Sequence, residues 1–371
     1  MVRPTTDRHR FVTEPVEGGT VSAREARTGP TRPRSGRAGD GAPEVPSARR
    51  SGTRSASVDA ARPPAPDGLV VGPVPVAARL AGALLVLAGL AGLAAPFPTY
   101  LVVGGHALSQ ATGVGSALVA LVVPLLNLAV GVVTARGAVP KFGLAYAGVV
   151  GTLAVGELLI ELYRGSSSTS RPGVEVIAGR RVLTSSIAVG AGWVLGVAAL
   201  CLVVAAGLAA AAAWGRTVME DDGALDPVRS ALAGAAVLLG VATVLSLALP
   251  AADVPDQLVT DPSTGMQTVV TREGPQALLE RPGLALLGGL LLAGALVLCS
   301  VVAPSLRPRL ATVGALLAIT GTVLAAGLTG LRDALLSPDL EWTVPGAALV
   351  VSGVAYAGLT ALAWRLRRTV V

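Results

Sequence analysis

Residues 284–303 read LALLGGLLLAGALVLCSVVA, twenty consecutive residues without a charged side chain. An α-helix needs about 20 apolar residues to cross the hydrocarbon core of a bilayer. Comparable runs recur from residue 74 to the end of the chain. They cover residues 74–95, 115–135, 142–163, 186–213, 229–249, 284–303, 310–330 and 346–364. The sequence therefore predicts an all-α polytopic membrane protein with about eight transmembrane helices.

The composition excludes several other classes of protein. Of the 371 residues, 52% are apolar and 14% are charged, whereas a soluble domain carries about a quarter charged residues. Aromatic residues make up 3%, which is too few for a base-stacking surface, so we expect no nucleic-acid partner. Cys201 and Cys299 lie in apolar runs without a nearby Cys or His. We therefore expect no metal, no cofactor and no disulfide framework.

Residues 1–72 differ sharply from the rest of the chain. They hold 12 Arg, 8 acidic residues and one aromatic residue, Phe11, among many Pro, Gly and Ser. Such a segment cannot bury enough apolar surface to offset the entropy of ordering, so it is predicted to be a disordered cytoplasmic tail. Two alternatives stay open, namely that the tail contacts anionic lipid headgroups, or that translation starts at Val70 or Val71.

The distribution of cations sets the expected orientation. With the N-terminus in the cytoplasm, the inner segments carry Arg136, Lys141, Arg216, Arg229, Arg307, Arg309, Arg365, Arg367 and Arg368. The first outer loop, residues 96–114, holds no Arg or Lys, although the outer loop 164–185 holds four Arg. Because cytoplasmic loops are enriched in cations, we expect a multi-pass protein of the inner (plasma) membrane with both termini in the cytoplasm.

Two halves of the chain resemble one another. Residues 75–83 (PVAARLAGA) and 227–235 (PVRSALAGA) are identical at six of nine positions. Further similarities are the Gly-Thr step at residues 151–152 and 321–322, and the Trp that ends the fourth and the eighth span. These matches predict two tandem four-helix units, residues 73–214 and 215–371, related by an axis along the membrane normal. The alternative is chance similarity between helices rich in Ala, Gly, Leu and Val.

Three segments between spans have the pattern of short strand pairs. Residues 100–109, 174–184 and 257–271 contain β-branched runs around Gly-Gly, Ala-Gly and Pro-x-x-Gly steps, which are typical of hairpins. We expect short extracytoplasmic hairpins that gate a cavity, bind a partner or merely close the loops.

Three polar side chains inside the spans are the candidate site residues. Glu157 and Glu161 lie four residues apart, on one face of the third span. Intramembrane carboxylates mark ion or proton sites by default, and the alternative for Glu157 is a bond to a neighbouring helix or a protonated carboxyl group. Glu161 is expected near the headgroups, paired with Arg164. Asn127 follows Pro124 in the second span, where it either joins two helices or marks a broken helix.

The sequence offers little support for catalysis. It contains no Walker motif, no dinucleotide fingerprint and no Gly-x-Ser-x-Gly elbow. The acidic residues within 220–226 lack the Asp pattern of CDP-alcohol phosphotransferases, so we interpret this segment as a solvated loop. We expect a protein that is not an enzyme; a membrane transferase that uses Asp221 and Asp222 is the remaining enzymatic hypothesis.

The step Pro96-Phe97-Pro98 and the pair Gly192-Trp193 resemble those of small four-span actinobacterial membrane proteins of unknown function. The resemblance covers about residues 74–214 and implies a four-helix unit without implying an activity. The first functional hypothesis is a transporter or permease-like subunit in the lipid bilayer. The alternative is a scaffold or accessory subunit that binds a membrane-protein partner, or a second copy of itself, through its outer loops or tail.

Overall fold

The computed structural model describes residues 69–103, 106–166, 174–177, 180–183, 187–221, 225–254, 257–260, 267–270, 277–278, 283–336 and 340–366. The structural statements below concern these residues. The predicted tail falls outside them up to residue 68. At its end, Val70–Val71 form strand β1, so the prediction of disorder is wrong there. β1 pairs antiparallel with β7 (Met219–Glu220), and Gly72 extends the pairing by donating its N–H to the carbonyl of Val218 at 3.0 Å.

Within the described residues, eight helices are long and apolar enough to cross a membrane. The chain is thus a multi-pass integral membrane protein. The helices are α1 (Val76–Ala94), α2 (Val114–Ala135), α3 (Pro140–Ser166), α4 (Ala191–Trp214), α5 (Arg229–Leu247), α6 (Leu284–Val302), α7 (Arg309–Leu336) and α8 (Val344–Arg365).

Two helices have ends that differ from the sequence prediction by several residues. The fourth span was expected from residue 186, but Ile187–Val189 form strand β6 and α4 begins at Ala191. The chain passes close to another backbone here, since a Cβ added to Gly190 would lie 2.0 Å from the carbonyl oxygen of Thr99. Helix α7 continues to Leu336, six residues past the predicted end of the span. Its last turns carry Arg332 and Asp333, whose side chains form an ion pair of 2.6 Å.

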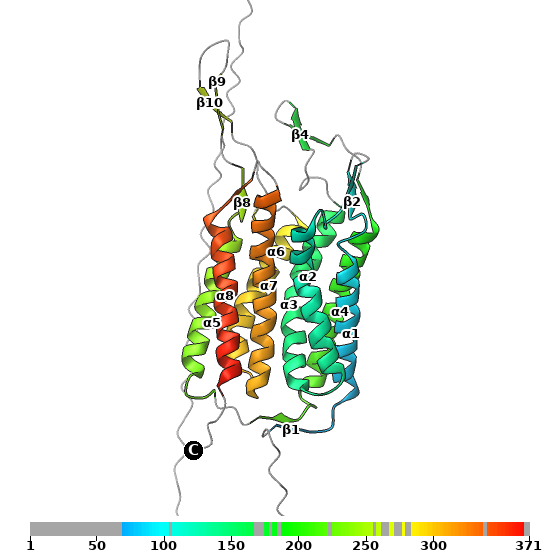
Figure 1. Ribbon diagram of the computed structural model, residues 1–371, viewed down its shortest axis with the longest axis vertical. Helices are drawn as coiled ribbons and strands as arrows, with labels where there is room; N and C mark the ends of the chain where they lie inside the picture. The colour runs from blue at the N-terminus through cyan, green and yellow to red at the C-terminus, as the bar shows by residue number, and fades with distance from the viewer. Residues whose placement is uncertain are drawn as a thin grey trace, which may run out of the picture. The chain divides into compact units, whose positions relative to one another are not determined.

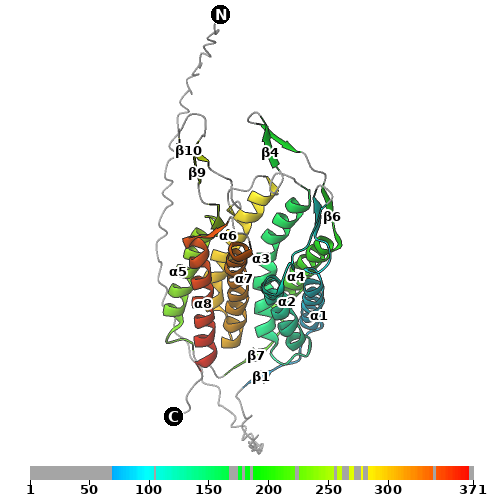
Figure 2. The ribbon, with the colours of Figure 1, turned by 45° about the horizontal axis from the view of Figure 1, so that its top comes forward.

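Helices α3 and α7 form the centre of the bundle. Both are mostly buried and pack against each other, and α3 also packs against α4 and α6 while α7 packs against α2 and α8. Figure 2 shows them side by side between the other helices. The pattern of neighbours repeats: α1 contacts α2 and α4, just as α5 contacts α6 and α8. We refer to α1–α4 as the first group and to α5–α8 as the second group.

The two ends of the bundle differ in structure. Helix α1 begins and α8 ends at the same end, drawn at the bottom of Figure 1. Strands β1 and β7 lie at this end too, as Figure 2 shows. We call this the lower end and the opposite one the upper end. The remaining strands connect helices at the upper end and form antiparallel pairs. They are β2 (Leu101–Val103) with β3 (His106–Leu108) and β6, β4 (Val174–Ile177) with β5 (Arg180–Leu183), β9 (Gln257–Thr260) with β10 (Gln267–Val270), and β8 (Ala252–Asp253) with β11 (Glu341–Trp342).

Small residues allow the helices to approach closely, as is common inside membranes. A Cβ added to Gly151 of α3 would lie 2.8 Å from the Cα of Gly207 in α4. Similarly, a Cβ on Gly82 of α1 would lie 2.9 Å from the carbonyl oxygen of Gly131 in α2. Neither position can accept a larger side chain without moving a helix.

Candidate functional site

A cavity of about 430 Å³ lies between the first and the second group, in the upper half of the bundle. Its wall on the first group comes from α3 and includes Glu157, Glu161 and Arg164, together with Leu200 of α4. The second group supplies the end of α5 and residues 249–252 that follow it, Leu292 in the middle of α6, the upper part of α7 with Asp333, and Leu349 in the second turn of α8. The cavity therefore combines an apolar wall with several charged side chains.

The position of Glu157 is set by a close contact between α3 and α6. A Cβ added to Gly156 would lie 2.6 Å from the carbonyl oxygen of Gly288, and one added to Gly288 would lie 2.9 Å from the side chain of Ile160. The two helices thus touch directly beside Glu157. This contact holds the carboxylate at the boundary between the two groups.

Glu157 makes no hydrogen bond and no ion pair within the part of the chain that the structure describes. Its side chain is partly buried and lines the cavity. A carboxylate inside a membrane span is costly unless water or a partner compensates its charge, and among the described residues no protein group does so. Glu157 is therefore an acidic side chain of the cavity wall that a proton or a cation could bind without displacing a protein partner.

Glu161 lies one turn further along α3 and is held by several groups. The hydroxyl of Tyr100 donates to its Oε1, and Arg164 pairs with its Oε2 at 3.3 Å. The indole N–H of Trp193 donates to its backbone carbonyl at 3.1 Å. The side chain of Glu161 is 12% exposed, whereas that of Arg164 is 47% exposed. The expected pairing of Glu161 with Arg164 is present, and Glu161 joins α3 to the segment before β2 and to α4.

Tyr100 was not singled out from the sequence. Burial raises the pKa of its hydroxyl above the ordinary value, and the negative charge of Glu161 raises it further. The phenol therefore remains a donor to Glu161 over the whole physiological range. The two residues are 61 positions apart in the chain, so no local pattern could have shown the contact.

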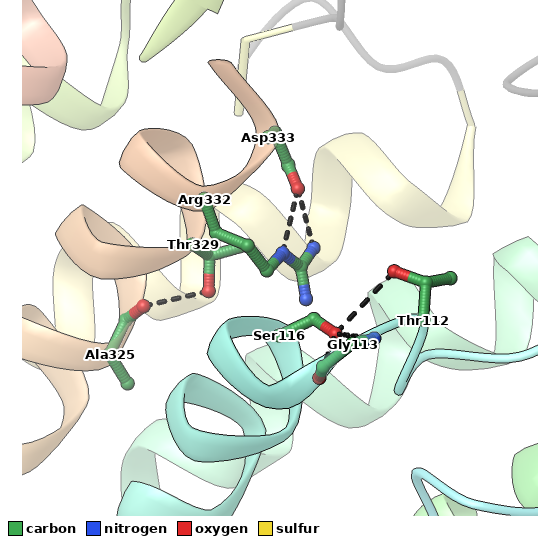
Figure 3. A network of polar contacts seen from close by, with 7 residues as sticks. All are labelled: Thr112, Gly113, Ser116, Ala325, Thr329, Arg332 and Asp333. Atoms are coloured by element: carbon green, nitrogen blue, oxygen red, sulfur yellow. Dashed lines mark hydrogen bonds and ion pairs between the residues drawn. The ribbon is translucent and has the colours of Figure 1, made fainter. Parts of the chain in front are cut away.

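The opposite wall of the cavity carries a second acid–base pair. Nε and Nη2 of Arg332 donate to Oδ1 of Asp333 at 2.9 and 2.6 Å. Figure 3 shows the guanidinium pointing toward the first turn of α2, where Ser116 is hydrogen-bonded to Gly113. Because the predicted seventh span ended at residue 330, both charged residues were missed.

Asn127 lies elsewhere. Its Oδ1 accepts a hydrogen bond of 2.8 Å from the hydroxyl of Tyr146, and Asn127 is buried between α2 and α3. Helix α2 continues through Pro124 as a single helix. Tyr146 precedes Glu157 by eleven residues on α3, which is roughly 16 Å along the axis. The structure therefore does not bring Asn127 and Glu157 together.

At the lower end, the acidic segment behaves differently from expectation. Asp221 is buried and pairs with Arg309 at 3.3 Å, with side-chain exposures of 4% and 8%. The interpretation as a solvated loop is wrong for Asp221, whose carboxylate also accepts from the N–H of Leu310. Asp222 lies outside the described residues.

No family model matches the chain, and no curated protein or solved structure matches it either.

Proposed function

We propose that this chain is a transporter or permease-like membrane subunit, not an enzyme, and that the upper cavity is its solute site. Glu157 is the ionisable group of this site. The observation that carries the proposal is a carboxylate without a partner among the described residues, lining a cavity between two groups of four helices. Solute sites of secondary transporters commonly lie at the interface between structural repeats.

The charges around the cavity support this role for Glu157 over its neighbours. Glu161 is paired with Arg164, and Asp333 is paired with Arg332. Both pairs stabilise the walls and leave their acids compensated. Glu157 is the acid whose charge remains to be balanced, so binding of a proton or of a cationic solute gains the most free energy there.

The neighbour pattern supports the proposed duplication. In each group the first helix contacts the second and the fourth, and the third contacts the fourth. Across the boundary, α3 packs on α6 and α2 packs on α7. A two-fold axis along the membrane normal would exchange α2 with α6 and α3 with α7, and would therefore turn one of these contacts into the other. Such an axis would pass between α3 and α7.

The test is charge movement through proteoliposomes adsorbed to a solid-supported membrane. The protein is perfused with a panel of amines, amino acids and sugars, with and without an imposed pH gradient. We expect at least one compound to evoke a pH-dependent current in the wild type, and Glu157→Gln to reduce it by an order of magnitude or more, as for removal of an essential proton-transfer group. The matched control is Glu341→Gln, which removes an exposed carboxylate in β11.

Two results would contradict the proposal. One is a wild-type protein that is folded but evokes no current with any compound of the panel. The other is a current that persists unchanged in Glu157→Gln.

The alternative, a scaffold or accessory subunit, is favoured by one observation. Within the described residues, the β9–β10 and β4–β5 hairpins each pair only with themselves, which leaves strand edges for a partner chain. Replacing residues 251–283 by a short linker would then abolish a co-purifying protein, and Glu157→Gln would leave it bound.

We further propose that the lower end faces the cytoplasm of a cell whose plasma membrane holds the protein. Arg136, Lys141, Arg216 and Arg307 all lie there, in agreement with the positive-inside rule. A C-terminal fusion to green fluorescent protein should be fluorescent, and a fusion to periplasmic alkaline phosphatase should be inactive. The reverse pair of results would invert the orientation.

A further inference from the structure

We infer that a groove between α3, α4 and α6, near the lower end of the bundle, binds an acyl chain of a phospholipid with an anionic headgroup. The groove has a volume of about 300 Å³. It is distinct from the upper cavity, and this inference does not depend on the transport proposal.

The wall of the groove is almost entirely apolar and faces away from the bundle. Leu298 and Trp214 line it, and Leu298 is 64% exposed. The hydroxyl of Thr152, which also lines the groove, donates to the carbonyl of Gly148 at 2.7 Å, so its hydrogen-bond donor is used within α3. In a bilayer such a surface is covered by hydrocarbon, and a concave surface can hold one acyl chain in a fixed position.

The depth of the groove depends on Gly148. A Cβ added to this residue would meet nothing within 4 Å, so the space beside it is open. Leu144 and Thr152, one helical turn to either side on α3, complete this wall of the groove. A larger side chain at position 148 would fill the groove without disturbing a helix contact.

Cations lie at the end of the groove where a headgroup would sit. The ammonium of Lys141 is 5.6 Å from the centre of the Trp214 ring. Arg216 follows Trp214 by two residues, and Arg307 directly follows Leu306, another residue of the wall. Arg307 pairs with the exposed Asp226 at 3.3 Å, which leaves a net positive charge. This charge is complementary to a phosphate diester with an anionic headgroup.

Trp214 provides a direct readout of the occupant. The chain has four Trp residues, and replacing Trp193, Trp342 and Trp364 with Phe leaves Trp214 as the single fluorophore. This variant is reconstituted into phosphatidylcholine vesicles that contain increasing fractions of brominated phosphatidylglycerol or, separately, of brominated phosphatidylcholine. Bromine quenches the indole only when the acyl chain lies against it.

We expect the brominated anionic lipid to reach half-maximal quenching at a mole fraction roughly fivefold lower than the brominated zwitterionic lipid. This is the effect of one cation attracted to a headgroup with a net negative charge. Lys141→Gln combined with Arg307→Gln should remove this preference. Arg79→Gln is the matched control, since Arg79 is an exposed cation on α1 at the same end, and it should retain the preference.

A second pair of variants tests the groove itself. Gly148→Leu should weaken quenching by both lipids, whereas Gly358→Leu, at an equally open position on α8, should leave it unchanged. Equal quenching by the two headgroups would overturn the inference, as would a preference that survives the double cation variant. If Gly148→Leu leaves the quenching unaltered, the acyl chain binds outside the groove and the inference is wrong.

Discussion

The carboxylate of Asp221 lies across the start of α7 and binds Arg309. Its Oδ1 accepts from Nε of Arg309 at 3.3 Å, and its Oδ2 accepts from the backbone N–H of Leu310 at 3.0 Å. The guanidinium also donates to the carbonyl oxygens of Trp364 and Leu366 at the end of α8. One buried ion pair thus joins the connector between the two groups to the beginning of α7 and the end of α8.

Removing Asp221 is expected to be strongly destabilising. Asp221→Ala leaves the buried guanidinium of Arg309 without its carboxylate, and loss of one partner of a buried pair costs about 3–5 kcal/mol. The measurement is the free energy of unfolding in mixed micelles of increasing SDS content. Asp226→Ala is the matched control. The carboxylate of Asp226 is 67% exposed and pairs with Arg307 and Arg229, and each such solvent-screened pair contributes at most ~1 kcal/mol. Equal effects of the two variants would contradict this account.

The contact between Gly151 and Gly207 predicts a second difference between variants. Gly207→Val places side-chain atoms where the backbone of α3 lies, because the nearest Cα would be 3.0 Å from the new Cβ. We expect a loss of about 1–3 kcal/mol, as for other overpacked cores. Gly196→Val, on the same helix at a position without neighbours within 4 Å, should cost little. The thermal unfolding midpoints of the two variants decide the point, and a shift in Gly196→Val as large as that in Gly207→Val would refute it.

The hydrogen bond between Tyr146 and Asn127 predicts a modest coupling. Interhelical hydrogen bonds in membranes contribute about 0.6 kcal/mol on average and about 1.7 kcal/mol at most. A double-mutant cycle of Tyr146→Phe and Asn127→Ala should therefore give a coupling energy in this range. If the two single effects simply add, the bond seen between α2 and α3 does not stabilise the fold.

Tyr100 should make stability sensitive to alkaline pH. Its pKa in the folded protein is raised above the ordinary value of 10.0, so the folded state holds the phenolic proton more tightly than the unfolded state does. The stabilisation is complete below the ordinary pKa of 10.0 and is lost as the pH rises through the raised pKa of the folded protein. Tyr100→Phe should cost about 1.5–3 kcal/mol at neutral pH through the lost bond to a charged acceptor.

The measurement compares unfolding of the wild type and Tyr100→Phe between neutral pH and the highest pH at which the bilayer is intact. The difference between the two proteins should shrink as the pH rises past 10.0. Other buried tyrosines are common to both proteins and cancel in this difference. A difference that stays constant with pH would exclude the assigned role of the phenolic proton.

The number of helices could be predicted from the sequence because each apolar run is long enough to cross a bilayer on its own. Their arrangement could not, because hydropathy does not separate inner from outer helices. Helices α3 and α8 have the same mean hydropathy of 1.7, yet α3 lies mostly buried and α8 does not. The Glu161–Arg164 pair follows from helical spacing alone. The contacts of Glu161 with Tyr100 and of Asp221 with Arg309 depend on tertiary packing, because their partners lie 61 and 88 residues apart. Arg332 and Asp333 lie beyond the predicted end of the span at residue 330, because the sequence does not show that a helix with two charged residues continues to Leu336.

The pairing of Val70–Val71 with Met219–Glu220 has a mechanical consequence. The residues that precede α1 are hydrogen-bonded, at the lower end of the bundle, to the connector between the two groups. Tension applied to the chain before Val70 is thus transmitted to this connector as well as to α1. A partner that binds and pulls the N-terminal segment would therefore also pull on the connector between the first and the second group.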